Sequence, residues 1–585
     1  MNKMKNIWLK SAFLAVAGLS LGSCADFLDV DPLTLVYEDN YWKEKNDVDQ
    51  VITGCYVRMQ GDDFLRRLFI WGESRSDNVR VGMKPDLDVN SAESKIEQED
   101  ILATNPYTDW VSFYEIINRC NLVIEKAPQV AEVDPAYLQS DVEAVIAEAK
   151  GLRALCYFYL VRAFKDVPFY THALVDDEQQ LNFPATKGDD IVRFLIQDLV
   201  EAYPHALKAW PKVNGEDKSY ARITQNAIFA MLTDMYLWMG DDVNAAAYAQ
   251  RVIDSKLAAF KEQYYSSAFM VDGYPLLPDF DSHAFATPGT ASMEIFGYGG
   301  SVESILELDF DANYKTNGSA ANEMTSAFFY RGPNQEYKDH PSEPGLFAPA
   351  KELWTEPKDP KLFLNNNDIR VMTSMWFENA TEPDQNEVYI AKYAFMRTYL
   401  VGFTANLNTA EWMPRNSDDA NWILYRVSDV MLMKAEALVW QLPEGEGAWS
   451  EHDEALAQEA FDLVQAVSRR SMRNLNSPLA FSDYQSKAKL IELVYDERRR
   501  ELLFEGKRWF DLVRRSRREG NTEYLRGKIV GKFDGGTGVN ATSRMMNIDG
   551  VYWPYAESEL KYNTNLKQNP AYPDSENNSY ESTIK

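Results

Sequence analysis

The chain has 585 residues, with 60 Lys and Arg against 89 Asp and Glu, and a formal net charge of −29. This acidic excess argues against nucleic-acid binding, which needs clustered basic side chains to neutralise phosphates. The five histidines do not stand at metal-binding spacings, so zinc chemistry is not expected. With 45% apolar and 25% charged residues, the composition is that of an ordinary globular protein.

The first 23 residues predict a bacterial lipoprotein signal peptide. Lysines precede an apolar run over residues 11–22, which is too short to span a bilayer. The run ends in Leu21-Gly22-Ser23-Cys24, which resembles a lipoprotein processing site, although Gly22 stands where Ala or Ser is usual. Cleavage before Cys24 would free its thiol and amino group to carry acyl chains, which anchor a protein stably. Ordinary secretory cleavage, with Cys24 incidental, is the alternative.

Cys55, Cys120 and Cys156 follow the predicted signal. An odd number cannot form a complete disulfide framework, and each of the three lies in a stretch with helical apolar periodicity. We therefore expect buried free thiols.

Helical periodicity of apolar side chains marks two blocks of the chain. The first block predicts helices over residues 141–164, 189–207 and 223–239, with a further helix from 245 onward. The second predicts helices over residues 423–440, 453–470 and 487–515. Small alanines facing aromatics, as in residues 231–249, resemble degenerate tetratricopeptide units, which stack into an α-α superhelix.

Between residues 264 and 420, Pro and Gly multiply and the helical periodicity fades. Short alternating stretches at 303–310 and 386–393 predict strands. The predicted fold is therefore mainly α, a tetratricopeptide-like scaffold with a loop-rich insertion that contains short strands. The expected parts are a signal peptide (1–23), an N-terminal helical part (24–263), the insertion (264–420), a C-terminal helical part (421–572) and a polar tail (573–585).

Motifs for catalysis or metal binding occur only as fragments. Ser76-Asp77-Asn78 and Ser486-Lys-Ala-Lys489 match elements of penicillin-binding proteins, but their order is reversed and Lys-Thr-Gly is missing. The stretch from Asp309 begins like a calcium loop, but Tyr314 stands where Gly is required and Ala320 where Glu is required. The pattern favours a solvated acidic turn over a weak structural calcium site, and no other cofactor is expected.

Aromatic residues in the loop-rich segment bear on function. A pyranose ring has an apolar face that a Tyr or Trp ring can cover, while polar side chains bind its hydroxyl rim. Tyr298 and Tyr314, flanked by Gly and Asp, are the best candidates for such a platform. For any single aromatic residue, core packing is the favoured alternative.

Several stretches resemble the SusD/RagB-like lipoproteins of the Bacteroidetes outer membrane. The most specific is residues 491–514, which match the C-terminal signature of that family. The others are Ala-Asp-Phe-Leu-Asp-Val-Asp-Pro32 after Cys24, Trp553-Pro-Tyr-Ala-Glu557 with 565–572 (Ala571 replacing the usual Gly), and smaller matches at 72–78 and 425–437.

The resemblance implies a non-catalytic, lipid-anchored protein on the cell surface. Such proteins bind an oligosaccharide or polysaccharide and close as a lid over a SusC-like TonB-dependent transporter, with tetratricopeptide helices facing the transporter. Ligand-contacting positions vary in the family, and the candidates here are Asp77, Asn78, Tyr298, Tyr314 and Arg370. Asp77 and Asn78 capping a turn, and Arg370 in a structural salt bridge, are the alternatives. Peptide or other nutrient binding on the same scaffold, and a secreted glycosidase, are the competing functions.

Charged residues of the signature lie three or four positions apart, so the predicted helix would bring them onto adjacent faces. Arg498 would pair with Glu501 or, two helical turns on, with Glu505, and Glu505 would pair with Arg508. We interpret the set as a partly buried ion-pair network that fixes this helix to the bundle; a Glu pair for acid–base catalysis is the alternative. The set comprises Glu497, Arg498, Glu501, Glu505, Arg508 and Trp509.

Overall fold

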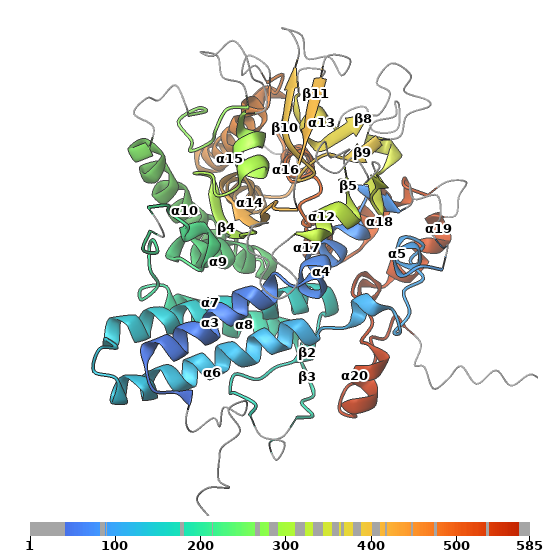
Figure 1. Ribbon diagram of the computed structural model, residues 1–585. Coiled ribbons are helices and arrows are strands. Elements are labelled where there is room, and N and C mark those ends of the chain that lie inside the picture. Colours follow the sequence, from blue (N-terminus) through green and yellow to red (C-terminus); the bar gives the residue numbers. More distant parts are fainter. Residues whose placement is uncertain are drawn as a thin grey trace, which may run out of the picture.

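The computed structural model describes most of residues 41–572 (Figure 1). The predicted signal peptide, Cys24 and the polar tail lie outside the described residues. So do internal segments at 82–87, 89, 176–178, 180, 213–214, 264–269, 280–289, 311–321, 332–342, 354–361, 364–367, 378–387, 401–409, 416–417, 446–448, 473–476 and 534–537.

Packed helices form the lower half of the molecule in Figure 1. Helix α7 (Gln139–Phe164) packs along α6 (Val111–Val133) on one side and α8 (Gly188–Ala202) on the other, and α6 also contacts α3 (Lys45–Met59). Next, α9 (Gln225–Met239) packs against α8. The predicted helices at 141–164, 189–207 and 223–239 are thus confirmed, although α8 ends at Ala202.

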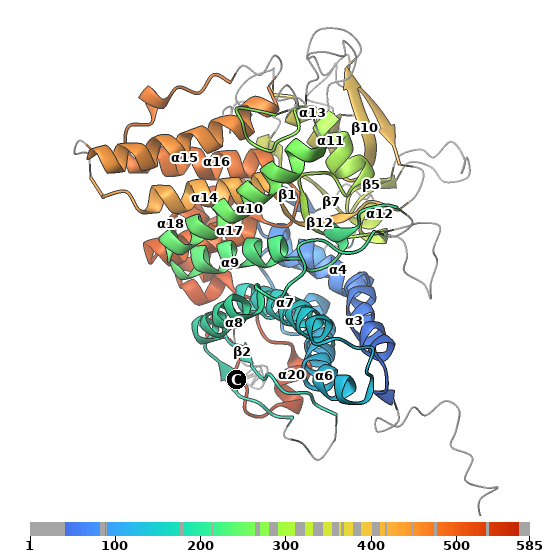
Figure 2. The ribbon, with the colours of Figure 1, turned by 90° about the vertical axis from the view of Figure 1, so that its left-hand side faces the viewer.

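The two helical blocks form one continuous stack. Helix α10 (Asp242–Gln263) packs on α9 and also on α14 (Val427–Trp440), which lies beyond the loop-rich segment in sequence. Helix α14 then packs on α15 (Glu451–Arg470) and α16 (Lys487–Glu501), and the group is visible in Figure 2. The mainly helical fold is confirmed, and the order of helix pairs is consistent with tetratricopeptide-like stacking.

Short antiparallel strand pairs characterise the loop-rich segment at the top of Figure 1. The pairs within or next to it are β4 (Ser304–Leu308) with β12 (Trp422–Arg426), β5 (Tyr330–Arg331) with β6 (Glu343–Pro344), β8 (Met375–Phe377) with β9 (Val388–Ile390), and β10 (Phe395–Leu400) with β11 (Ala410–Pro414). Strands β4 and β9 confirm the predictions at 303–310 and 386–393. Strand β1 (Val79–Val81), from the N-terminal part of the chain, pairs with β7 (Phe347–Pro349) of the same segment. Strand β2 (Val167–Pro168) pairs with β3 (Ala185–Thr186) in the N-terminal helical part.

Two predicted helices are wrong in their bounds. The helix predicted from residue 423 begins at Val427, because the buried, largely aromatic and β-branched stretch before it pairs with β4 as β12. The helix predicted over 487–515 is two helices, α16 and α17 (Arg508–Glu519). The backbone at Phe504 (φ 66°) and Gly506 (φ 71°) is left-handed, which ends a right-handed helix.

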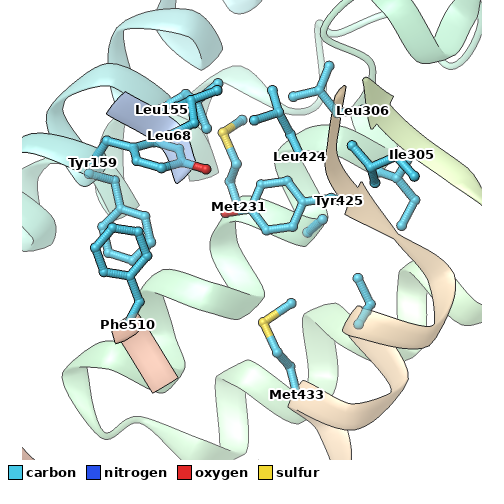
Figure 3. Close-up of a cluster of buried hydrophobic side chains, with 14 of the residues drawn as sticks. Leu68, Leu155, Tyr159, Met231, Ile305, Leu306, Leu424, Tyr425, Met433 and Phe510 are labelled. Atoms are coloured by element: carbon cyan, nitrogen blue, oxygen red, sulfur yellow. The ribbon is translucent and has the colours of Figure 1, made fainter. Parts of the chain in front are cut away.

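The hydrophobic core runs through both helical blocks. Figure 3 shows Leu155 and Tyr159 of α7 beside Met231 of α9, with Tyr425 of β12 and Phe510 of α17 in the same cluster. Residues far apart in sequence therefore share one core.

Cys55, Cys120 and Cys156 are buried and free, as predicted, and the sulfurs of Cys55 and Cys120 lie 4.0 Å apart. Burial raises the pKa of Cys120 and of Cys156 well above the ordinary thiol value. Both thiols are therefore inert members of the core.

Candidate functional site

Tyr298 is an exposed aromatic residue on a rigid support. It ends the π-helix η6 (Met293–Tyr298) and is 61% exposed, whereas Phe296 of the same turn is buried. Single exposed aromatic residues are common on protein surfaces, so exposure alone does not mark a binding site. It does leave the Tyr298 ring open to a ligand, as the role predicted for it from the sequence requires.

Two contacts hold η6 against β10. At Gly297 a Cβ would lie 2.2 Å from the carbonyl oxygen of Met396, so only glycine permits this approach. Arg415 donates hydrogen bonds to the carbonyl oxygens of Phe296 and Gly297, and its Nε donates to the carbonyl oxygen of Tyr393 at 2.9 Å. These contacts hold the backbone that carries Tyr298 in place.

The chain turns sharply after Tyr298. Gly299 (φ 73°) and Gly300 (φ 61°) are both left-handed, a conformation that other residues adopt at a cost. The buried carboxylate of Glu307 accepts hydrogen bonds from the Gly300 N–H and from Asn421 Nδ2, both at 2.9 Å. Burial raises the pKa of Glu307, and these donors act in the opposite direction.

A second tyrosine joins this turn from a distant part of the chain. The ring of Tyr220 lies where a side chain at Gly300 would be, with its Cε1 2.4 Å from the position of a Cβ. The Tyr220 hydroxyl donates to Asp309 Oδ1 at 3.3 Å, and Lys218 Nζ pairs with Asp309 Oδ2 at 2.8 Å. We call Tyr298, Gly299, Gly300, Tyr220, Lys218 and Asp309 together the Tyr298 surface.

The Tyr298 surface combines an apolar ring with hydrogen-bonding groups of both kinds. The Tyr298 ring can cover the apolar face of a sugar. The Lys218 ammonium supplies donors, and the Asp309 carboxylate supplies acceptors. Sequence reasoning missed Lys218 and Tyr220, because they lie about 80 residues before Tyr298 and belong to no motif; Asp309 was considered only as a calcium ligand.

Asp77 and Asn78 are not part of this surface. Asp77 is 4% exposed, and its carboxylate pairs with Arg508 at 2.8 Å and Arg499 at 3.3 Å. Asn78 is fully buried; it donates to Glu73 Oε1 and accepts from Arg499 Nε, both at 2.8 Å. Both side chains are engaged inside the protein, so we assign them a structural role.

Arg370 is likewise buried, at 4% exposure. It pairs with Asp368 at 2.8 Å, Glu497 at 2.7 Å and Glu501 at 3.3 Å, which is the salt bridge that the sequence left open as an alternative. Of the proposed ligand contacts, only Tyr298 lies exposed among the described residues. Tyr314 and the rest of the acidic loop after Phe310 lie outside them.

The signature residues form the buried ion-pair network that was predicted, but with other partners. Glu501 is shared by Arg370, Arg426 and Arg470, which come from three different elements. Burial alone would raise the pKa of Glu501, but these three guanidinium groups together hold it well below its usual range. A carboxylate held ionised in this way cannot serve as a general acid.

The predicted pairs along one helix are wrong. Arg498 pairs with Asp429 at 3.0 Å and Asp511 at 2.9 Å, and Arg508 pairs with Asp77. Glu505 binds Lys392 at 2.9 Å and Arg426 at 2.7 Å. The break between α16 and α17 removes the helical spacing between Glu505 and Arg508. Arg498 keeps its spacing to Glu501 within α16 but pairs instead with acidic residues of other elements. Trp509 is buried, and Arg75 lies over its ring at 4.3 Å.

The motif at residues 72–78 packs against the segment between α16 and α17. At Gly72 a Cβ would lie 1.9 Å from the carbonyl oxygen of Gly506, so the two backbones touch. The carboxylate of Glu73 accepts from the backbone N–H groups of Lys507 at 3.1 Å and Arg508 at 3.4 Å, at the start of α17. Two motifs separated by more than 400 residues are therefore one packing unit.

In the described part of the chain, cavities also lie away from the Tyr298 surface. One of about 260 Å³ lies where α7, α8 and α17 meet, and ion-paired side chains such as Lys165, Asp166 and Arg517 line it. Another of about 20 Å³ adjoins Glu501. Among the described residues, no group of three or more His, Cys, Asp or Glu is placed to hold a metal ion.

Comparison with known families identifies the scaffold. A model described as "SusD family" matches residues 289–572, and one described as "Starch-binding associating with outer membrane" matches residues 26–237. In the part of the chain that the structure describes, no helix is long and apolar enough to cross a membrane.

Individual proteins that are similar to this chain also carry SusD names. SusD-like protein P38 of Formosa agariphila is 25% identical and aligns over 98% of this chain and 100% of its own length; SusD-like protein P2 of the same organism is 25% identical over 85% and 88%. A SusD superfamily protein from Bacteroides vulgatus has a TM-score of 0.63 at 18% identity, covering 91% of this chain and 100% of its own. A structure named "Laminarin binding SusD-like protein" has a TM-score of 0.61 at 20% identity, covering 91% and 100%. With both family models and the full-length relatives in agreement, the chain belongs to the SusD family.

Proposed function

We propose that this protein binds an oligosaccharide or polysaccharide at the cell surface and, as a lid, delivers it to a SusC-like TonB-dependent transporter. In this proposal acyl chains on Cys24 hold it to the outer membrane, and it breaks no bond in its ligand. Its family and the name of the laminarin-binding structural neighbour support carbohydrate as the ligand class.

The observation that carries the proposal is Tyr298, 61% exposed on a turn fixed by Arg415 and Glu307. A rigid support matters because a ring that is already in place loses little conformational entropy when a sugar stacks on it. The neighbouring Lys218 and Asp309 supply donors and acceptors for hydroxyl groups. We therefore place the sugar face on Tyr298 and the hydroxyl rim toward this ion pair.

Retardation in native gels tests the proposal, using protein that begins after Cys24 and gels that contain individual polysaccharides. A polysaccharide that binds should be retained about five- to thirtyfold less tightly by Tyr298→Ala, which corresponds to about 1–2 kcal/mol of lost stacking. Tyr562→Ala is the matched control, because Tyr562 is 76% exposed at the end of α20 (Glu557–Tyr562), on the scaffold at the bottom of Figure 1.

Equal losses in both variants would place the ligand elsewhere. Retention of peptides with no retention by any polysaccharide would replace carbohydrate with peptide as the ligand class. Shortening of a glycan during incubation with the purified protein, abolished by a single Asp or Glu substitution, would establish a glycosidase and overturn the non-catalytic role.

A further inference from the structure

Carboxylates surround the Tyr298 surface. Asp309 belongs to it, and the buried carboxylate of Glu307 accepts a hydrogen bond from the Gly300 N–H of the turn. Glu216 and Asp217, which directly precede Lys218 in the chain, are exposed. Burial, and then the charges of Asp309, Glu307 and Glu216, raise the pKa of Tyr220. These carboxylates are therefore close enough to act on a charge placed beside the Tyr220 ring.

The described lysines near the Tyr298 surface are already engaged. Lys218 is paired with Asp309 at 2.8 Å. Lys256 points inward, where its ammonium donates to the carbonyl oxygens of Val302 and Ser304, and burial lowers its pKa to about 8. Burial alone would raise the pKa of Asp217, but hydrogen bonds from Ser219 and then the charges of Lys212 and Lys256 lower it, so Lys212 too acts on a carboxylate.

Arginine is the side chain best suited to carboxylate and sulfate groups, because its fork binds two oxygens at once. Arg415, which holds the turn, donates hydrogen bonds from its guanidinium to the carbonyl oxygens of Phe296, Gly297 and Tyr393. It also donates to the carboxylate of Asp419 at 2.6 Å. It has no pair of donors left to face a ligand. Among the residues that the structure describes here, an anionic sugar would therefore lose water without gaining a matching cation.

Hydroxyl groups fit the same surface better. A hydroxyl both donates and accepts, and the Lys218–Asp309 pair offers both functions side by side. A sulfate or carboxylate only accepts, so it would meet Asp309 as a repulsive neighbour.

We propose that the Tyr298 surface selects uncharged saccharides and disfavours chains that carry carboxylate or sulfate groups. The inference rests on the proposed function, since it assigns the ligand class of that same site. By Coulomb's law, two carboxylates each about 8 Å from an anionic group in water weaken its binding about fivefold at low salt, and the effect shrinks as salt screens it.

The test uses neutral laminarin, starch, xylan and mannan, each beside its carboxymethyl derivative of the same chain length. For at least one backbone, the neutral form should bind in a Tyr298-dependent way, and the carboxymethyl form about fivefold more weakly at 20 mM salt. Glu216→Lys should raise affinity for the carboxymethyl form severalfold and change neutral binding less than twofold. Glu201→Lys, an exposed charge reversal on α8, should change neither.

Each outcome decides between the claims. Equal or tighter binding of the carboxymethyl form, still lost in Tyr298→Ala, overturns the neutral selectivity and leaves the saccharide function standing. An unchanged preference in Glu216→Lys also overturns the electrostatic explanation. No binding to any neutral or carboxymethyl polymer overturns the proposed function and the inference with it.

Discussion

Replacing Glu501 with alanine would leave three buried guanidinium groups without the carboxylate that they share. Arg426 lies 2.5 Å and Arg370 3.3 Å from the carboxylate, and Arg470 also binds it. Glu501 itself is 2% exposed, so water cannot take its place without opening the core.

The expected cost follows from how buried ion pairs behave. Removing one partner of such a pair costs about 3–5 kcal/mol, because the other charge stays desolvated and uncompensated. Each arginine keeps a second acidic partner here, as Arg470 keeps Glu303 at 2.9 Å, so we expect a loss within that range and not a multiple of it. Domains are stable by about 5–15 kcal/mol, so the loss is a large share of the total.

Urea unfolding followed by tryptophan fluorescence measures the change, with Glu492→Ala as the control. Glu492 lies on the same helix α16, pairs with Arg515 at 2.5 Å and has a side chain 41% exposed, so its loss should cost less than about 1 kcal/mol. Because both variants change Glu to Ala in one helix, helix propensity cancels.

The pH dependence gives a second readout. The pKa of Glu501 lies well below 4.5 in the folded protein, so its stabilisation is full above that value and is lost as the pH falls further. The difference between wild type and Glu501→Ala should therefore shrink below pH 4.5. Equal unfolding curves for Glu501→Ala and Glu492→Ala at neutral pH would refute the structural reading of the network.

Three further predictions concern other parts of the chain. Gly72→Ala should destabilise the protein by about 1–3 kcal/mol or more in urea unfolding, because its Cβ would overlap Gly506, whereas Gly527→Ala has open space and should be neutral or stabilising; similar midpoints would refute the close contact. Burial raises the pKa of Glu73 from 4.5 to about 7, so the folded state holds its proton more tightly and stability should fall by about 3 kcal/mol as the pH rises from 4.5 to 7. Glu73→Gln should remove that slope in a pH series of unfolding curves, and an unchanged slope would assign it to other groups. Cys24→Ala should abolish incorporation of labelled fatty acid and release the protein from the outer membrane; retention with no label would leave another anchor to be found.

The helices were predictable because their apolar stripes repeat with the helical period. Residues 141–164 and 453–470 form α7 and α15 almost as predicted. The two errors have a shared cause: periodicity does not report tertiary strand pairing at β12, nor the left-handed backbone at Phe504 that divides α16 from α17. The proposed boundaries of the loop-rich insertion stay a prediction.

The candidate site was predictable only in part. Tyr298 could be chosen because it is an aromatic residue in a Gly-rich, aperiodic stretch, and it is exposed. Arg370, Asp77 and Asn78 are candidates by residue type and, for the last two, by their place in a loop after the first helices. Neither property distinguishes a ligand contact from a buried polar contact. Tyr220 could not be found, since only the fold brings its ring against Gly300.

The sequence by itself determined the family, the helical scaffold and the expectation of an acyl anchor at Cys24, because motifs and apolar periodicity are local properties of the chain. The tertiary structure decided which charges meet. Glu501 and Asp77 bind arginines from distant segments, since a buried charge must find a partner wherever the packing supplies one. Likewise, the sequence proposed Tyr298, but only the fold decided that its ring is exposed while Phe296 of the same turn is buried.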